Sequence, residues 1–326
     1  MKNLSIGVEG YGRRGKVLLN RLVCVPGIDS IYVHDINDSK KLEIEQYSPK
    51  VRWVDSYKDS LEKVDGMIIA TSPSSHFQLA KLALEHSKDL LLEKPSTLYY
   101  KDDCELEKIS KSKGRFVSVG LSERFNEVVE RARKNIDFSD VDLCFSLRRN
   151  WPEEKGEDPG LERDLILHDL DLDILFFGKV PEILSIKSLK DRSYLHLLFG
   201  NADAELNARL IENTKYRYRG ALFFGTEKYY FLDYAAQEFH ESRGLIIPEE
   251  WRKQFYKVDY PLLLHMTRPI ETKIPSIDEP VPKMLNCFIS SIRADEILEP
   301  MCSISESKIR TQVIEEALKY KTSSQL

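Results

Sequence analysis

A glycine-rich turn near the N-terminus constrains the fold of this chain more than any other feature. Gly10, Gly12 and Gly15 have the spacing G-x-G-x-x-G, directly after the apolar run of residues 4–8 and before a helical pattern. In a strand–turn–helix unit such glycines allow a tight turn, the close approach of a pyrophosphate and close helix–strand packing. The pattern therefore predicts a Rossmann-type dinucleotide site. The cofactor contacts expected in this loop are Gly10, Tyr11, Gly12, Arg13 and Gly15.

An acidic residue ends the second apolar run, about 20 residues beyond the last glycine, as the dinucleotide pattern requires. That residue is Asp35, at the end of residues 31–35. Its carboxylate would accept the two ribose hydroxyls of NAD and repel the 2′-phosphate of NADP. We therefore expect NAD as the cofactor, with NADP as the alternative because Lys40 and Lys41 lie nearby.

Strand and helix patterns go on alternating through the first third of the chain. Residues 64–70 and 89–92 indicate buried strands, and a strand at residues 116–120 would close a dinucleotide-binding domain of residues 1–121. Ligands of open α/β sheets bind at the carboxyl ends of the parallel strands, so polar residues that follow these strands are expected at the cofactor edge. They are Ser72, His76, Glu93 and Lys94.

Beyond residue 121 strand patterns dominate. They lie between residues 140 and 233, and two helical patterns end the chain, the second with a predicted capping box of Ser303 and Glu306. With few helices to serve as crossovers, consecutive strands should pair antiparallel. The expected fold class is α/β: a doubly wound parallel Rossmann sheet in residues 1–121, and a substrate-binding α/β domain with a large, mostly antiparallel open sheet in residues 122–326.

An apolar helical segment between the strands carries a polar stripe. Asp164, His168 and Asp171 are spaced i, i+4 and i+7 within residues 164–178, where most other positions are apolar and Gly178 is expected to end the helix. A helix this apolar is expected to be largely buried, so its charged groups must be paired or face a cleft. The residues alone leave three interpretations open: a capped helix with a core histidine, a metal site, or acid–base chemistry in which Asp164 orients His168 and keeps its titration in a useful range.

In this order and at these intervals, the motifs of the chain resemble those of the Gfo/Idh/MocA oxidoreductase family. The motifs are the glycine loop, Asp35, Glu93-Lys94-Pro95 and Asp164-x-x-x-His168-x-x-Asp171. The resemblance implies hydride transfer between nicotinamide and a secondary alcohol carbon of a sugar or polyol. It also implies that the open sheet serves oligomerisation, so a homo-oligomer, dimer or tetramer, is expected.

The resemblance further implies that Lys94, Asp164 and His168 are the catalytic residues. Of these, His168 is the expected general base and Lys94 the positioning group, because an unperturbed histidine titrates near roughly 6.5 and lysine near roughly 10.4. Burial could exchange the two roles.

Two segments are similar to those of family members that oxidise nucleotide-activated amino sugars. They are Ser122-Glu123-Arg124-Phe125-Asn126 and Arg148-Arg149-Asn150-Trp151-Pro152. On this basis the expected substrate contacts are Asn126, Arg149 and His168. Glu127 and the charged residues 159–163 depart from the family pattern on the expected substrate side, so they put the substrate in doubt more than the reaction.

Composition narrows the classes of partner. The net charge of −5 argues against nucleic acid, which usually requires a basic face, and favours a small polar ligand. Five cysteines without a CxxC pair suggest neither a disulfide framework nor a zinc knuckle. Because the first strand begins at once and no apolar run is long enough to span a bilayer, we expect no signal peptide, no membrane contact and a cytoplasmic protein.

Two other classes of function compete with a dehydrogenase. A dinucleotide-binding sensor or scaffold without turnover would need the glycine loop and Asp35 but not Lys94, Asp164 and His168. A metal-dependent hydrolase would be centred on His168 and Asp169, although the other histidines are scattered. The presence of all three catalytic residue types favours the dehydrogenase, with no metal site expected.

Overall fold

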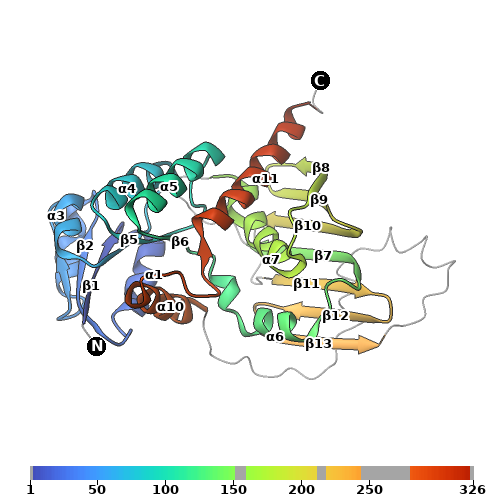
Figure 1. The fold of residues 1–326 in the computed structure, drawn as a ribbon, viewed down its shortest axis with the longest axis horizontal. Coiled ribbons are helices and arrows are strands. Elements are labelled where there is room, and N and C mark those ends of the chain that lie inside the picture. Colours follow the sequence, from blue (N-terminus) through green and yellow to red (C-terminus); the bar gives the residue numbers. More distant parts are fainter. Residues whose placement is uncertain (1–2, 151–158, 211–217, 244–279, 324–326) are drawn as a thin grey trace.

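The computed structural model describes residues 3–150, 159–210, 218–243 and 280–323, which form two seven-stranded sheets (Figure 1). Helices α7 (Leu167–Phe177) and α11 (Ile304–Ser323) lie between the sheets. The predicted combination of a parallel Rossmann sheet and a mostly antiparallel open sheet is confirmed. The division of the chain into domains at residue 121 stays a prediction.

The first sheet has the strand order β14-β6-β5-β4-β1-β2-β3, and all neighbouring strands except β14 and β6 run parallel. Its strands are β1 (Leu4–Glu9), β2 (Ile28–His34), β3 (Val51–Trp53), β4 (Gly66–Ile69), β5 (Asp89–Leu92), β6 (Val117–Val119) and β14 (Cys302–Ser303). Helices cover both faces, so the successive side chains of Leu90, Leu91 and Leu92 are all fully buried. Leu91 packs with helices α1 (Arg13–Leu22) and α10 (Pro280–Ala294), and its two neighbours pack on the opposite face.

The opposite face carries helices α3 (Tyr57–Lys63), α4 (Pro73–Glu85) and α5 (Tyr100–Lys113). Three short elements of this part were not predicted: β3, α2 (Lys41–Glu45) and α3. Each spans too few residues to show a clear period in the sequence, so tertiary packing decides its conformation.

The second sheet has the order β13-β12-β11-β7-β10-β9-β8. Its strands are β7 (Val141–Asn150), β8 (Glu182–Ser188), β9 (Arg192–Phe199), β10 (Ala202–Leu210), β11 (Tyr218–Gly225), β12 (Lys228–Asp233) and β13 (Glu238–Arg243), the last of which was not predicted. The expectation that consecutive strands pair antiparallel is confirmed for β8–β9–β10 and for β11–β12–β13. It does not extend to β7, which pairs parallel with β10, because α7 forms a crossover between β7 and β8.

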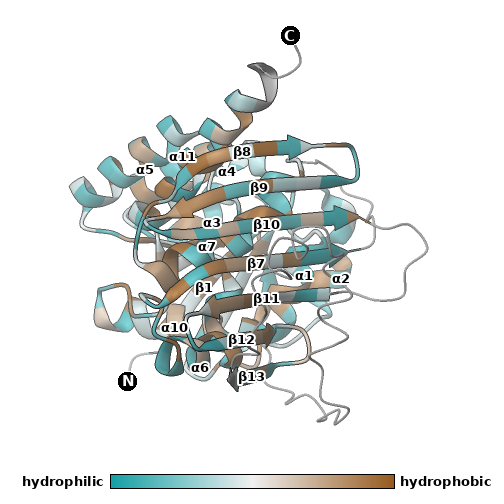
Figure 2. Cartoon of the chain, turned by 90° about the vertical axis from the view of Figure 1, so that its right-hand side faces the viewer, coloured by the Kyte–Doolittle hydropathy of each residue, from teal (hydrophilic) through white to brown (hydrophobic). Residues whose placement is uncertain are grey.

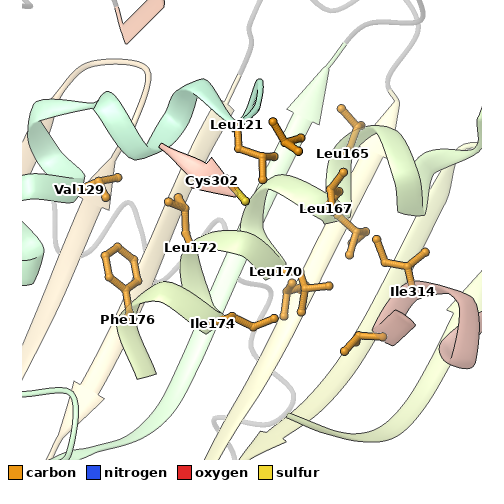
Figure 3. Packing of buried hydrophobic residues seen from close by; sticks show 14 of the residues in the cluster. Leu121, Val129, Leu165, Leu167, Leu170, Leu172, Ile174, Phe176, Cys302 and Ile314 are labelled. Atoms are coloured by element: carbon orange, nitrogen blue, oxygen red, sulfur yellow. The ribbon is translucent and has the colours of Figure 1, made fainter. Parts of the chain in front are cut away.

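One face of the second sheet is covered by α7, α11 and α6 (Glu127–Asn135), whose apolar side chains form a shared core (Figure 3). Leu167, Leu170 and Ile174 of α7 lie in this core with Ile314 of α11. Figure 2 shows the other face, where apolar positions alternate with polar ones along the strands. Phe145 and Phe224 meet there edge to face, with ring centroids 6.2 Å apart.

The end of the chain returns to the first sheet. Helix α10 packs on α1, and β14 pairs antiparallel with β6 before α11 begins. The predicted capping box is confirmed, since Ser303 N donates to Glu306 Oε2 at 2.9 Å and Glu306 N donates to Ser303 Oγ at 3.2 Å. Among the described residues, no helix has the length and apolarity needed to cross a membrane.

Candidate active site

The carboxyl ends of four adjacent strands form the edge of the first sheet on which the candidate site is built. In the order β5-β4-β1-β2, these strands lead into the Glu93-Lys94 segment, the loop of Ser72, the glycine loop and Asp35. Because the strands are parallel and hydrogen-bonded side by side, residues from distant parts of the sequence meet at one edge. The structure thus brings together the segments predicted to bind the cofactor.

The glycine loop has the geometry that a dinucleotide requires. Gly10 has a φ of +93°, and a side chain there would lie 2.7 Å from the carbonyl oxygen of Ala70. A Cβ atom on Gly15 would lie 2.0 Å from the carbonyl oxygen of Gly10, so helix and loop can pack only with glycine. A Cβ atom on Gly12, by contrast, would meet no atom within 4 Å, and Gly12 is the N-cap residue of α1. The open backbone at the helix N-terminus therefore fits a pyrophosphate group.

Asp35 is fixed by three donors. Its Oδ2 accepts the backbone N–H of Tyr11 at 2.7 Å and Nζ of Lys40 at 2.8 Å, and its Oδ1 accepts the backbone N–H of Asn37 at 2.9 Å. Burial alone would raise the pKa of Asp35, but these hydrogen bonds outweigh it and hold the pKa below its usual value. Asp35 is therefore ionised at neutral pH. One oxygen of this carboxylate, which is expected to bind the ribose, already accepts a hydrogen bond from Lys40.

Glu93 connects the glycine loop with the end of β5. Its Oε1 accepts a hydrogen bond from Nε of Arg14 at 2.8 Å, and its side chain is 5% exposed. Arg14 occupies one of the variable positions of G-x-G-x-x-G and was not among the predicted site residues. Arg13, which was predicted, is exposed.

The two predicted residues after β4 lie in different environments. Ser72 is exposed and caps α4 without a side-chain hydrogen bond. His76 is buried, with Nδ1 2.9 Å from the carbonyl oxygen of Pro95 and Nε2 3.2 Å from that of Thr71. Burial lowers the pKa of His76, so the neutral ring can donate to only one of these carbonyls. His76 holds the segment after Lys94 against α4, and its direct contact with a cofactor stays a prediction.

Lys94 and Asp164 form an ion pair between the two sheets. Nζ of Lys94 donates to Asp164 Oδ1 at 2.7 Å and to the Asp164 carbonyl oxygen at 2.8 Å. Both side chains are about four-fifths buried, at 18% and 19% exposure. Burial lowers the pKa of Lys94, while the carboxylate of Asp164 acts in the opposite direction. Asp164 lies in a π-helical turn, Glu162–Ile166, of a kind that often occurs at functional sites.

His168 is the second residue of helix α7, and one of its ring nitrogens has no partner in the described structure. Its Nδ1 is buried and has no hydrogen-bond partner among the described residues. Burial lowers the pKa of His168 well below its usual value, and the positive charges of Lys94, Arg148, Arg219 and Arg14 lower it further. We expected Asp164 to orient His168 and keep its titration in a useful range, but Asp164 pairs with Lys94 and the imidazole is neutral.

The remaining acids of α7 hold the helix in place. Asp171, expected to share the face of His168, instead accepts Nη2 of Arg124 at 2.6 Å and Nε of Arg310 at 3.0 Å. Asp169 accepts Nη2 of Arg148 at 2.7 Å. These three arginines were not among the predicted site residues, although the rule that buried carboxylates need partners signalled them. The distant Arg310 could not be paired with Asp171 without the fold.

The two other expected substrate contacts lie in different surroundings. Asn126 is 2% exposed; its Oδ1 caps α6 by accepting the N–H of Val128 at 3.1 Å, and its Nδ2 donates to the carbonyl oxygen of Tyr234 at 2.8 Å. Arg149 alternates along β7 with the buried Arg148, so it lies on the face of the sheet opposite α7. Direct contact of Asn126 or Arg149 with a substrate stays a prediction.

Metal chemistry has no evident centre in the described parts of the chain. No group of three or more His, Cys, Asp or Glu side chains has the arrangement that would hold a metal ion there. The cysteines of these segments are all unpaired thiols, of which Cys144 and Cys302 are buried.

Comparison with known proteins relates this site to a family. Residues 4–121 match the model of Gfo/Idh/MocA proteins, described as an oxidoreductase family with an NAD-binding Rossmann fold. The resemblance to the Gfo/Idh/MocA oxidoreductases is confirmed. Residues 4–121 accordingly have the NAD-binding Rossmann fold that this model describes, and the expected cofactor class is confirmed.

Curated relatives of the Gfo/Idh/MocA type are similar over part of their length. The chain is 26% identical to scyllo-inositol 2-dehydrogenase (NAD(+)) of Bacillus subtilis over 190 residues, 55% of each protein. It is 24% identical to UDP-N-acetylglucosamine 3-dehydrogenase of Acidithiobacillus ferrooxidans over 181 residues, 56% of each protein. The matched segments thus span about half the length of these relatives.

Solved structures are similar to this chain over the whole fold. A structure of UDP-N-acetylglucosamine 3-dehydrogenase from Acidithiobacillus ferrooxidans superposes with a TM-score of 0.80, covering 98% of both chains at 18% identity. A dehydrogenase from Chromobacterium violaceum gives a TM-score of 0.78 at 17% identity, covering 100% of this chain and 97% of the other. At these identities the likeness concerns the fold.

Proposed function

We propose that this protein is an NAD(P)-dependent dehydrogenase that transfers a hydride between nicotinamide and a secondary alcohol of a sugar, polyol or nucleotide sugar. The observation that carries the proposal is the pairing of Lys94 with Asp164 at the cofactor edge of the Rossmann sheet, at 2.7 Å. His168, one helical turn beyond Asp164, is a neutral imidazole with a free nitrogen. A sensor or scaffold that only binds a dinucleotide would have no need for this arrangement.

The dinucleotide would be held by the backbone of the glycine loop and by Asp35, and when bound it supplies the hydride acceptor at its nicotinamide ring. Lys94 keeps its proton through two hydrogen bonds to Asp164, which leaves one N–H for the substrate oxygen. The ammonium group therefore stabilises negative charge that develops on this oxygen.

His168 takes the hydroxyl proton as the hydride leaves the same carbon, so the alcohol becomes a carbonyl. Nδ1 of His168 is available as an acceptor because the ring is neutral and this nitrogen has no partner in the described structure. Lys94 is already engaged with Asp164 as a donor, which favours His168 as the base. In the reverse direction His168 returns the proton to the alkoxide.

The substrate class rests on the relatives, whose names describe dehydrogenases of inositols and of a UDP-linked amino sugar. All of these substrates carry secondary alcohols in a ring. We therefore propose inositols, free sugars and nucleotide sugars as the first candidates. A panel of the three classes, each assayed with NAD and with NADP, would test the proposal through formation of the reduced dinucleotide.

The same assay on variants would test the assigned roles. Lys94→Ala and His168→Ala should each lower turnover by about a hundredfold or more, the range typical of lost acid–base groups. Lys81→Ala is the matched control, because Lys81 pairs with Glu105 on the surface at 2.7 Å. Wild-type turnover in both active-site variants would refute the mechanism. Some Gfo/Idh/MocA proteins keep the dinucleotide bound throughout the cycle, so bound dinucleotide should also be measured before and after substrate addition.

We also propose that a second copy of the chain covers the open face of the second sheet. The half-buried aromatic side chains of Phe145 and Phe224 lie on this face, which no helix of the described residues covers (Figure 2). Burial of such a face would stabilise a homo-oligomer. Light scattering after size-exclusion chromatography would measure the molar mass, and a monomer at micromolar concentration would contradict the proposal.

A further inference from the structure

A carboxylate without a cationic hydrogen-bond partner is buried beside the segment that follows Lys94. Asp103 lies in the first turn of α5 and is fully buried. Its Oδ2 accepts hydrogen bonds from Oγ of Ser96 at 2.8 Å and from Oγ1 of Thr311 at 2.7 Å. Its Oδ1 is also buried and has no hydrogen-bond partner among the described residues. A buried acid of this kind is costly to ionise, so its position calls for a function.

The two hydroxyl groups join Asp103 to separate parts of the fold. Ser96 lies two residues beyond Lys94, in the segment that leads from β5 to α5, and Thr311 lies on α11. Oγ of Ser96 is also 2.9 Å from Oγ of Ser307, which lies on α11 one turn before Thr311. The segment that carries Lys94 is thus fastened to α5 and α11 through one carboxylate.

Helix α11 continues this connection to the histidine. Arg310, adjacent to Thr311, donates from Nε to Oδ1 of Asp171 at 3.0 Å, and Asp171 lies three residues after His168 on α7. Two neighbouring residues of α11 therefore hold the Lys94 segment on one side and the His168 helix on the other, as expected from the place of α11 between the two sheets (Figure 1).

We propose that Asp103 is a positioning residue for Lys94, and that protonation of Asp103 loosens the segment of residues 94–97. The proposal rests on the function proposed above for Lys94. An ionised Asp103 accepts both hydroxyl protons at Oδ2. A protonated Asp103 must itself donate, either from Oδ1, where the described structure offers no acceptor, or from Oδ2 at the expense of a hydroxyl donor.

The surroundings place this titration in an accessible range. Burial raises the pKa of Asp103 to about 6; the hydroxyl groups of Thr311, Ser96 and Thr97 oppose this shift, and the charge of Asp102 adds to it. The groups that face Asp103 are thus hydroxyls from α11 and from the Lys94 segment, and one acid from its own helix. Between pH 7.5 and 5 the carboxylate gains a proton while Asp103 itself stays buried. Because the hydroxyl groups stabilise the ionised form, protonation weakens the link between Ser96 and Thr311.

Amide hydrogen exchange of the full-length protein would test the proposal without a substrate. The rate of exchange for a peptide spanning residues 94–97, corrected for the chemical exchange rate, should rise about fivefold or more from pH 7.5 to pH 5 in the wild type. Asp103→Asn cannot titrate and leaves an amide donor without an acceptor, so it should exchange fast at both pH values. Glu105→Gln is the matched control, because Glu105 is exposed on the same helix and pairs with Lys81, and this variant should behave as the wild type.

Two hydroxyl deletions keep the test valid if Asp103→Asn folds poorly. Ser96→Ala and Thr311→Val each remove one donor and should also abolish most of the pH step. In turnover assays, the acidic limb of the kcat profile near pH 6 should disappear in Asp103→Asn and persist in Glu105→Gln. A wild-type pH step in Asp103→Asn would overturn the positioning role, whereas absence of turnover in the wild type, with the exchange step intact, would overturn only the proposed function.

Discussion

Nζ of Lys94, at the end of β5, lies 2.7 Å from Oδ1 of Asp164, in the turn that precedes α7. The two residues are 70 positions apart in the sequence and belong to segments that pack with different sheets. Their ion pair is largely shielded from water, so it is stronger than a surface pair and costs more to disrupt. It fixes the position of the only catalytic candidate contributed by the first sheet.

Asp164→Asn should shift the basic limb of the turnover profile to lower pH. Burial already lowers the pKa of Lys94, and the negative charge of Asp164 opposes that shift, so the neutral amide should let the pKa fall further. Lys94 would then lose its proton at a lower pH, and turnover at neutral pH should fall about tenfold or more. A pH series of kcat measures both effects; an unchanged limb would show that Lys94 is not the group that titrates. Asp142→Asn, at an exposed position of β7, is the control.

Two acids of α7 should respond in opposite ways to the same substitution. Asp171→Asn should destabilise the protein by about 3–5 kcal/mol, because it removes the charge that pairs with the buried Arg124 and Arg310. Asp173→Asn should leave the protein at least as stable as the wild type at neutral pH. Asp173 is fully buried, its Oδ2 has no hydrogen-bond partner among the described residues, and its Oδ1 only meets Sγ of Cys144 at 3.9 Å. Denaturant unfolding of the two variants, which differ by two positions, measures the contrast; destabilisation of similar size in both would contradict it.

Asp173 should also make stability fall as the pH rises. Burial raises the pKa of Asp173 well above its ordinary value, so above about pH 4 the native state keeps a proton that the unfolded state has lost. Stability from this group is complete at low pH and declines with rising pH, by at most about 1.4 kcal/mol per pH unit. Asp173→Asn should remove this slope. Unfolding free energies measured at several pH values between 5 and 8 would reveal it, and parallel slopes in variant and wild type would refute the assignment.

His168 should contribute a slope of the opposite sign. Burial and the surrounding positive charges lower its pKa in the native state, so below about pH 6.5 the unfolded state takes up a proton that the native state does not. Stability from His168 is therefore complete above pH 6.5 and is lost as the pH falls towards 5. In His168→Gln the loss between pH 7.5 and 5 should be smaller. His86, whose ring lies at an exposed position at the end of α4, provides the control substitution His86→Gln.

Lys40 should influence the choice between NAD and NADP. Its ammonium group pairs with Asp35 at 2.8 Å and so reduces the repulsion that the carboxylate would exert on a 2′-phosphate. Lys40→Met should therefore raise the ratio of the dissociation constants for NADPH and NADH about tenfold. Lys41→Met should leave the ratio unchanged, because Lys41 pairs on the surface with Asp55 at 3.2 Å. Fluorescence titration of both reduced dinucleotides measures the ratio, and equal ratios in the two variants would exclude a role for Lys40.

Local sequence patterns predicted the turns, strands and helix ends whose conformation is set by residues of the same short segment. The glycines of the first turn, the leucines of β5, Gly178 at the end of α7 and the capping box of Ser303 each act within a few residues. Gly178 has a φ of +62°, the conformation expected of a glycine that ends a helix. Such features depend on backbone conformation and side-chain period, so they can be read without the tertiary structure.

Pairings between distant residues could not be predicted in this way. A helical period placed Asp164, His168 and Asp171 on one face, but the π-helical turn and the positions of Lys94, Arg124 and Arg310 gave the acids different partners. Alternation along β7 likewise decided that Arg148, and not Arg149, faces α7.

The sequence by itself therefore determined the Rossmann unit, most of the strand segments of the second sheet and the identity of the polar residues that follow the parallel strands at one sheet edge. Only the tertiary structure decided which charges pair, that the imidazole of His168 is neutral, and that Asp103 binds Ser96 in the segment after Lys94. The physical reason is that burial and Coulomb interactions depend on distances between side chains, and these are fixed only when segments from both sheets and from α11 pack together.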